Sequence, residues 1–433
     1  MKVTLNDVCN FINGGAWSDK EYTTSGIPVI KVSNLQNDGV NFNNIDFLPE
    51  SSIQRYSRHL LQKGDLVIAT VGSHPNLVNS AAGRASIISE TAMGYLLNQN
   101  AVCVRSRDIE VLDQFYLAYL GKTSQFQNYI QQRGRGAANQ MRIAIGAIKE
   151  FEINLPQLEV QRRIASILSA YDDLIENNLK RIKLLEELAQ RTYEEWFIKF
   201  RVNGEALAID EETGLPVGWV QGTLEDLVSF QNGFAFKSSK FIEVGQPIIK
   251  IRNIDNNTVD VLNADCVDEQ YAKLADKFKL TTGDLLIAMT GATVGKVGYF
   301  PYSEKDCYLN QRVGRFIKKG IPNIHFAFSL MTLGNGLQQV LNYASGAAQP
   351  NISGSQILSI ETAIPTENLL VSFNNLAEAN NKQVLNLQNQ NRLLKHSRDI
   401  LLPRLMNGTI SVQEAERSFA MAAEPTNEYI VNK

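Results

Sequence analysis

The sequence predicts an α+β fold in which two similar mixed α/β domains are separated by a long antiparallel two-helix coiled coil. The first observation is an internal repeat, because GIPVIKVSNL at residues 26–35 returns as GQPIIKIRNI at residues 245–254. The second is a pair of long amphipathic segments, one after each copy of the repeat. A chain of 433 residues also exceeds what one hydrophobic core usually supports.

The repeat extends through both halves of the chain in one constant order. Its offset falls slowly, from 219 residues at the first match (245−26) to 209 at the last (365−156). Such a two-copy chain suggests a target that also has two parts. The further matches are KGDLVIATVG at 63–72 with TGDLLIAMTG at 282–291, LNQ at 97–99 and 309–311, GAA at 136–138 and 346–348, and EINLP at 152–156 with ETAIP at 361–365.

Changes in composition divide the chain into six segments. Within the first mixed domain we expect short strands near residues 28–32, 66–70 and 101–104 and one helix near 112–131. The predicted segments are a mixed domain over 1–156, a central long helix over 157–201, a polar linker over 202–221, a second mixed domain over 222–365, a distal long helix over 366–408 and a flexible tail over 409–433.

Apolar side chains recur every three or four residues along both long segments, from Ile164 to Trp196 and from Phe373 to Leu405. Two such faces avoid water most simply by packing against each other as a coiled coil. An antiparallel pair would carry the two domains at opposite ends, related by an approximate two-fold axis. Asn407 and Gly408 are a plausible stop for the second helix.

Three asparagines, Asn178, Asn380 and Asn391, interrupt the apolar stripes. Asparagine in a coiled-coil seam lowers stability but fixes the register of the helices. Exposed positions on curved helices are an equally acceptable interpretation.

Composition and cysteine usage favour a cytoplasmic protein. No apolar run approaches the length of a membrane span, and the first residues lack the apolar stretch of a signal peptide. The four cysteines lie far apart without CxxC spacing, so we expect reduced thiols that fill the core. The net charge of −3 indicates that any nucleic-acid surface is local or supplemented by a basic partner.

Several segments of the chain together form a recognisable pattern. The first copy departs from the pattern, because GAANQMRI lacks the proline of GAAQPN and VGSHPNLVNSAAGRAS replaces the TGATVGKVG loop. The segments of this pattern are the repeated strands that end at Asn34 and Asn253, GDLVIA and GDLLIA, TGATVGKVG at 290–298, LNQ, GAAQPNIS at 346–353, EEWFIKFR at 194–201, GLPVGW at 214–219 and LLPRLMNGTI at 401–410. With these segments in this order, the chain resembles over nearly its whole length the specificity subunit of a type I restriction–modification enzyme.

This resemblance implies a DNA-binding subunit without catalysis of its own. Each mixed domain would be a target-recognition domain that reads one half of a split double-stranded target, with unspecified bases between the halves. Two modification subunits would methylate adenine, and restriction subunits would translocate DNA and cleave it. No cofactor is expected on this chain, whereas S-adenosylmethionine, ATP and Mg²⁺ are expected on the partner subunits.

The residues themselves agree with a non-catalytic role. The Asn/Asp-Pro-Pro-aromatic tetrad of amino-methyltransferases does not occur, and His59, His74, His325 and His396 lack metal-ligand spacing. The glycines of residues 291–295 are separated by three residues where a phosphate-binding loop needs four. Two alternatives stay open: a coiled-coil scaffold that binds only proteins, and a self-contained enzyme.

Candidate DNA-contacting residues follow from side-chain chemistry. Arginine reads guanine and Asn or Gln reads adenine, while Lys, Ser and Thr mostly position the backbone. Two domains that read different half-sites should differ where they read, which favours the variable Arg84, Arg133 and Arg252 over the repeated Asn-Gln pairs at 98–99 and 310–311. The candidates are Lys31, Ser33, Asn34, Ser73, His74, Arg84, Arg133, Arg135 and Asn139 in the first domain, and Lys250, Arg252, Asn253, Thr290, Thr293, Lys296 and Gln349 in the second.

The helices are the expected docking faces for the partner subunits. Trp196, Phe197 and Phe200 are possible aromatic anchors at the end of the first helix. Packing of that helix end onto its own domain is at least as plausible.

Overall fold

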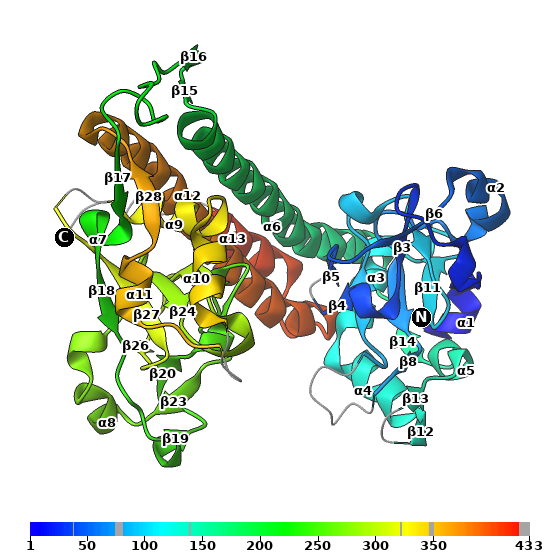
Figure 1. Ribbon diagram of the computed structural model, residues 1–433. Helices are drawn as coiled ribbons and strands as arrows, with labels where there is room; N and C mark the ends of the chain where they lie inside the picture. The colour runs from blue at the N-terminus through cyan, green and yellow to red at the C-terminus, as the bar shows by residue number, and fades with distance from the viewer. Residues whose placement is uncertain (38, 74–80, 138–139, 321–322, 346–349, 424–433) are drawn as a thin grey trace. The chain divides into compact units, whose positions relative to one another are not determined.

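The computed structural model describes the whole chain except residues 38, 74–80, 138–139, 321–322, 346–349 and 424–433 (Figure 1). It has two compact units, one formed by Met1–Ile175 with Leu393–Lys433 and the other by Glu176–Arg392. We call them the first and the second unit. Each contains one mixed α/β domain and a portion of both long helices. Among the described residues, no helix is long and apolar enough to cross a membrane.

Short strands in small sheets build the domain of the first unit. The main sheet has the order β2-β11-β7-β9, formed by Cys9–Asn13, Ala101–Ser106, Leu66–Ala69 and Ala85–Ile87. The other groups are β10-β3-β6 (Leu96–Leu97, Ile27–Ile30, Asp46–Leu48), β12-β13-β8 (Arg135–Ala137, Gln140–Arg142, Val71–Gly72), β4-β5 (Leu35–Gln36, Gly39–Val40) and β1-β14 (Lys2–Thr4, Glu152–Asn154).

The sheets of the second unit repeat this arrangement. Its main sheet, β18-β27-β24-β25-β22-β21, comprises Val228–Asn232, Val313–Lys318, Leu285–Ala288, Val297–Tyr299, Asn257–Val259 and Ile254–Asp255. The other groups are β19-β23-β20-β26 (Phe241–Ile242, Asp265–Val267, Gln246–Ile249, Tyr308–Leu309), β17-β28 (Val220–Thr223, Glu361–Ile364) and β15-β16 (Arg201–Val202, Glu205–Ala206). The first four strands of the main sheet follow the order of β2-β11-β7-β9, which confirms the internal repeat.

Short helices complete each domain. In the first unit α1, α2, α3, α4 and α5 comprise Leu5–Val8, Ile53–Tyr56, Gln114–Lys122, Ser124–Gln132 and Ile145–Lys149. In the second unit α7, α8, α9, α10 and α11 comprise Leu224–Leu227, Glu269–Lys273, Ile324–Thr332, Gly336–Ala344 and Gly354–Leu358.

The two long helices are α6, Leu158–Tyr193, and α12, Glu367–Met406 (Figure 1). In the second unit Asn178 lies beside Asn391, while the rings of Tyr193 and Phe373 have centroids 6.0 Å apart. Residue numbers therefore rise along one helix as they fall along the other, so the pairing is antiparallel as predicted. Gly408, with a φ of 74°, follows the end of α12 at the expected stop.

Polar and apolar residues alternate in the seam of this pair. In the second unit Ile182, Val384 and Leu387 form a buried cluster between the helices. Asn178 and Asn391 are each 6% exposed, and the Nδ2 group of Asn178 donates a hydrogen bond of 2.9 Å to Oδ1 of Asn391. These two asparagines thus occupy the seam, whereas Asn380 is only half-buried.

Two expectations about helices were wrong. The single helix predicted near residues 112–131 is broken at Thr123, whose hydroxyl caps α4 by accepting a 3.3 Å hydrogen bond from Phe126 N–H. The predicted flexible tail contains α13, Val412–Ala423. A capping box starts α13, because Ser411 N–H donates to Glu414 Oε2 at 2.9 Å, and Ala415 is fully buried.

The aromatic residues after α6 pack onto the second domain. Phe197 is 9% exposed, and its ring lies 5.1 Å from Phe326 and 5.9 Å from Trp219. The ring of Phe200 lies 5.4 Å from Trp219. Packing of this helix end onto its own domain is therefore confirmed, while the use of these aromatics as docking anchors stays a prediction. The predicted state of the cysteines is also confirmed, since all four are buried free thiols.

Candidate nucleic-acid interface

A short 3₁₀ turn follows an equivalent strand in each domain, and these turns with the lysine before each account for six of the predicted site residues. The turns are η2, Val32–Asn34, and η8, Ile251–Asn253. Asn34 is buried, its Oδ1 accepts from Lys31 N–H at 2.9 Å and its Nδ2 donates to the Asn41 carbonyl at 3.1 Å. Asn253 repeats these bonds with Lys250 and Asp260 at 2.9 and 3.0 Å. Both asparagine side chains therefore shape the turn and are not presented at the surface.

The lysine before each turn is fixed by an acid and an aromatic ring. Lys31 forms an ion pair with Asp46, and its Nζ lies 4.2 Å from the centre of the Tyr22 ring. Burial disfavours the charged form of Lys31, but the Asp46 carboxylate and Tyr22 together raise the pKa of Lys31 above its usual value. The lysine is held charged by its own domain.

The second domain reproduces this arrangement at the same spacing. Lys250 Nζ lies 2.5 Å from Asp265 Oδ2 and 3.6 Å from the centre of the Phe241 ring. Each of these three residues follows its counterpart by 219 positions (250−31, 265−46 and 241−22). We refer to the two sets as the lysine triads.

The middle residue of the turn is where the two copies differ. Ser33 occupies it in the first domain and Arg252 in the second, and both are exposed. The Arg252 side chain is 59% exposed, and its guanidinium lies 2.6 Å from Asp265 Oδ1.

A second turn lies next to η8. It is η10, Gly291–Thr293, and a Cβ placed on Gly291 would lie 3.6 Å from the Ile251 side chain. Lys296 is exposed just beyond this turn, with its Nζ 2.6 Å from Asp255 Oδ1. The hydroxyls of Thr290 and Thr293 are buried without a hydrogen-bond partner in the described part of the chain, and both residues are half-buried, so Lys296 is the exposed candidate of this group.

Arg84 in the first domain supports the strand after η2. Its guanidinium donates to the Leu35 carbonyl at 2.7 Å, and burial lowers the pKa of Arg84. This arginine is therefore engaged in the fold although the sequence favoured it for reading bases.

Arg133 and Arg135 are exposed around the start of β12, and Arg133 stacks 3.6 Å over the Tyr129 ring. β12 belongs to the small sheet β12-β13-β8, and Ser73 follows directly after β8. Arg135 therefore lies in this sheet and Ser73 directly follows one of its strands, while Arg133 caps the end of α4. The predicted His74, Asn139 and Gln349 lie outside the described residues.

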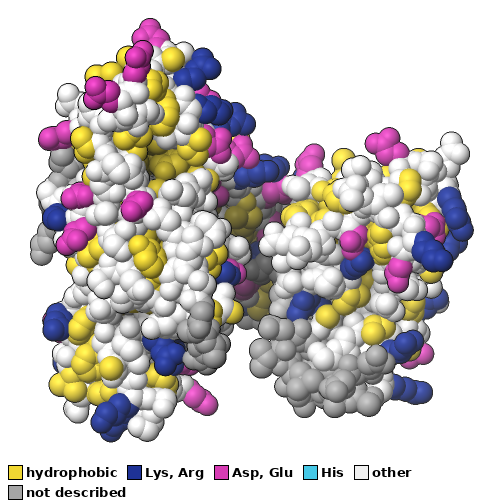
Figure 2. Space-filling model, in the orientation of Figure 1, with side chains coloured by type: hydrophobic (Ala, Val, Ile, Leu, Met, Phe, Trp, Pro, Cys, Tyr) yellow, Lys and Arg dark blue, Asp and Glu magenta, His cyan; other side chains and the backbone are white. Residues whose placement is uncertain are grey.

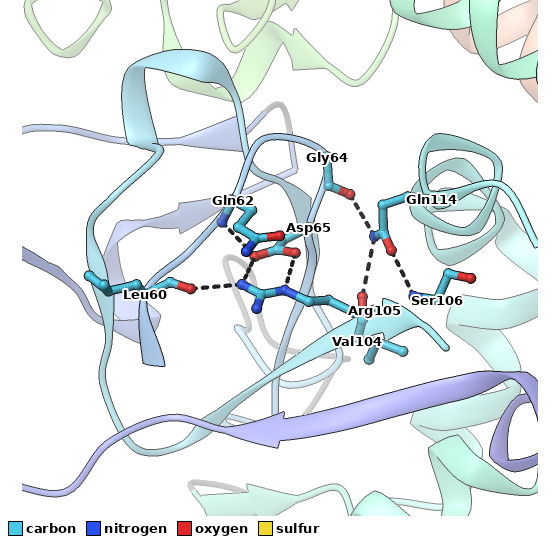
Figure 3. A network of polar contacts seen from close by, with 8 residues as sticks. All are labelled: Leu60, Gln62, Gly64, Asp65, Val104, Arg105, Ser106 and Gln114. Atoms are coloured by element: carbon cyan, nitrogen blue, oxygen red, sulfur yellow. Dashed lines mark hydrogen bonds and ion pairs between the residues drawn. The ribbon is translucent and has the colours of Figure 1, made fainter. Parts of the chain in front are cut away.

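Sequence reasoning missed an ion pair that occurs at the main sheet of each domain, and Figure 3 shows the one in the first domain. Arg105 donates to Asp65 through Nε at 2.7 Å and NH2 at 2.6 Å, and NH2 also donates to the Leu60 carbonyl at 2.7 Å. Gln62 N–H donates to the same aspartate at 2.7 Å. The aspartate of the repeated GDL segment was the available signal.

The second domain has an equivalent ion pair with equivalent backbone hydrogen bonds. Arg315 NH1 donates to Asp284 Oδ2 at 2.8 Å and to the Lys279 carbonyl at 3.0 Å, and Thr281 N–H donates to Asp284 Oδ2 at 2.8 Å. The repeat of GDL is thus explained by folding and not by contact with a ligand.

The backbone of the repeated Asn-Gln pairs makes close contacts within each domain, and a structural role for their side chains stays a prediction. Gln99 N–H donates to the Gly15 carbonyl at 2.8 Å, where two chain segments cross. A Cβ on Gly14 would lie 1.9 Å from the Asn98 carbonyl oxygen, and one on Gly233 would lie 2.2 Å from that of Asn310. Only glycine permits this approach in either domain.

Known proteins share this sequence pattern and fold. A family model described as type I restriction modification DNA specificity domain matches residues 1–187 and 216–368. The MjaIX and MjaVIII specificity subunits of Methanocaldococcus jannaschii are 27% identical over 311 and 335 residues, covering 69% and 75% of each chain. The crystal structure of a type I restriction–modification S subunit from M. genitalium has a TM-score of 0.59 at 16% identity and covers 94% of this chain and 95% of that one.

Proposed function

The chain belongs to the family of type I restriction–modification DNA specificity subunits, and we propose that it reads a bipartite DNA target through its two domains. Each domain would recognise one half-site, and the bases between the half-sites would be unspecified. The observation that carries this proposal is the contrast between the two copies. They share polar frameworks, including the half-buried lysine triads, yet differ at an exposed turn position.

The chain itself would be non-catalytic and would direct its partners. We expect two modification subunits to bind it, because an internally repeated protein offers two equivalent surfaces to two identical partners. S-adenosylmethionine for adenine methylation would reside on those subunits. ATP and Mg²⁺ would reside on restriction subunits that translocate and cleave DNA.

The direct test is base-resolved adenine methylation across the genome of a host with and without this gene, in the presence of its partner subunits. A split motif that disappears with the gene would support the proposal and give both half-sites and the gap. The absence of any gene-dependent motif, with all subunits expressed, would contradict it.

A coiled-coil scaffold without DNA-reading activity is the second candidate, favoured only by the net charge of −3. DNA binding separates the two functions. A specificity subunit in its complex should bind with an affinity that falls steeply as salt rises, because phosphate contacts release counterions. A scaffold should show no such binding.

The proposal also predicts how the gap is set. Four residues inserted in phase within residues 175–188 would add about one turn, or roughly 6 Å, to α6. This length corresponds to about two base pairs of B-DNA. The methylated motif should acquire a longer gap and keep both half-sites, whereas altered half-sites would show that the helix is not a passive spacer.

A further inference from the structure

The turns η2 and η8 are built alike but present different side chains. In both, a buried asparagine binds the preceding lysine N–H at 2.9 Å, and that lysine pairs with an acid and an aromatic ring. None of these interactions uses the middle residue of the turn. Because the first domain forms its turn with Ser33 there, the framework does not need Arg252 at the equivalent position.

Arg252 is exposed, and it shares its ion-pair partner Asp265 with Lys250. Asp265 receives Lys250 on Oδ2 at 2.5 Å and Arg252 on Oδ1 at 2.6 Å, so one carboxylate holds two cations. If Arg252 turned to another acceptor, Asp265 would keep Lys250, as Asp46 keeps Lys31 in the first domain. Release of Arg252 therefore leaves no unpaired acid behind.

The side chains around Arg252 suit the surface of a duplex. Lys296 follows the neighbouring turn, in which Gly291 approaches Ile251, and its side chain is 46% exposed. A lysine contributes a point charge suited to a phosphate, whereas the planar fork of arginine matches the O6 and N7 acceptors of guanine. An exposed arginine on one turn and an exposed lysine that follows the neighbouring turn thus provide one base-reading and one backbone-positioning group.

We propose that Ser33 and Arg252 occupy the same base-reading position of the two domains, and that Arg252 reads a guanine in the second half-site. In the free protein Asp265 orients the guanidinium of Arg252. On DNA binding, the guanidinium leaves Asp265 and binds the guanine. This inference rests on the proposed function, since it assigns a specificity residue to one of the two half-sites.

The experiment compares Arg252→Ser, which copies the first domain, with the unaltered chain in the complete complex with its modification subunits. The expected result is a methylated motif that becomes degenerate at one guanine of the second half-site, with the first half-site and the gap unchanged. Lys273→Ser is the matched control, because it also removes an exposed, ion-paired cation of the same domain. The control should leave the motif intact.

Duplex binding by the same complexes tests the contact at the level of single atoms. For the unaltered chain, replacing the read guanine by 7-deazaguanine or by another base should weaken binding by about 5- to 150-fold. For Arg252→Ser the same replacements should have little further effect. Arg252→Lys should restore part of the overall affinity but not the discrimination, since lysine lacks the bidentate fork.

Failure of the inference is distinct from failure of the proposed function. A second half-site without guanine on either strand, or equal penalties at every guanine in Arg252→Ser and the unaltered complex, would overturn the inference while a gene-dependent split motif remained. If Arg252→Ser abolished methylation altogether, the loss of duplex binding on replacement of each guanine would still show whether Arg252 reads one of them. The absence of any motif with the unaltered chain would overturn the proposed function itself.

Discussion

The two domains agree most closely where their polar groups are buried and differ most where side chains meet solvent. The Arg105–Asp65 pair and its counterpart Arg315–Asp284 bind the same backbone positions of their respective domains. On the surface, by contrast, Ser33 stands where the second domain has Arg252.

Comparison of the two copies assigns roles to residues that could not be assigned from a single domain. A residue repeated in both copies, such as Asp65, is explained by the fold that both copies share. A residue that differs on an identical backbone is free to serve whatever distinguishes the two domains. Figure 2 shows Lys and Arg side chains scattered over the visible face without one dominant basic patch. The distribution of charge alone would therefore not separate residues that build the fold from residues that distinguish the domains.

The largest effect is expected from removing the acid of the buried ion pair. Asp65→Ala would leave Arg105 buried and unpaired, and should lower the free energy of unfolding by about 3–5 kcal/mol. Asp284→Ala should cost less, because the Asp284 side chain is 21% exposed against 2% for Asp65. Urea unfolding of each variant measures the difference. Lys2→Ala breaks an exposed pair and should change stability by at most about 1 kcal/mol. Equal losses at Asp65 and Lys2 would contradict this view.

The next largest effect is a dependence of stability on pH, which distinguishes the second domain from the first. Burial lowers the pKa of His325 to about 4, with Glu378 opposing the shift and Lys318 and Lys382 adding to it. Between pH 6.5 and 4 the unfolded chain binds a proton that the folded chain does not, so stability falls as pH falls, by about 3 kcal/mol in total.

His325→Phe copies the first domain, which has Phe115 at the matching second position of its helix. The substitution should remove this pH dependence from the unfolding of the second unit. The comparison must use the slope against pH and not the absolute stability, because Tyr299 loses its 2.6 Å hydrogen bond to His325. An unchanged slope would refute the assignment.

A smaller effect is expected at the crossing of two segments in the first domain. Gly14→Ala would force a Cβ to 1.9 Å from a backbone oxygen, so the crossing must open at a cost of about 1–3 kcal/mol. Gly146→Ala is the control, since nothing lies within 4 Å of its added Cβ and Gly146 lies in α5. Thermal unfolding should separate the two variants, and similar midpoints would argue against a tight crossing.

The smallest change in stability is expected at the surface. Lys296→Ala should alter the free energy of unfolding by no more than about 0.5 kcal/mol. If Lys296 contacts one phosphate, the slope of log affinity against log salt for the complex should become less negative by about 0.9. An unchanged slope would remove Lys296 from the interface.

Periodicity and repetition predicted the fold well because they report on burial. The stripes that end in Leu405 and Trp196 identified both long helices, and the repeat identified both domains. The break at Thr123 was missed because the apolar pattern continues across it. The helix after Ser411 was missed because a short amphipathic segment resembles a tail until its packing partner is known.

The candidate site was harder to predict because chemical type does not reveal engagement. Asn34 and Arg84 have side chains suited to bases, yet both bind backbone groups of their own domain. The partner of Lys31 lies 15 residues further along the chain, at Asp46, where no local pattern connects them. Only the folded structure shows which polar groups are left exposed.

The constant spacing of the shared framework also records how the two halves have diverged. The offset stays at 219 from Gly14 and Gly233 through Asp65 and Asp284, then falls to 212 at Asn98 and Asn310. If the halves arose by duplication of one ancestral gene segment, no net insertion or deletion separates them over the stretch that holds the turn and its triad. New preferences at this turn would then evolve by point substitution, while changes in length are confined to later loops.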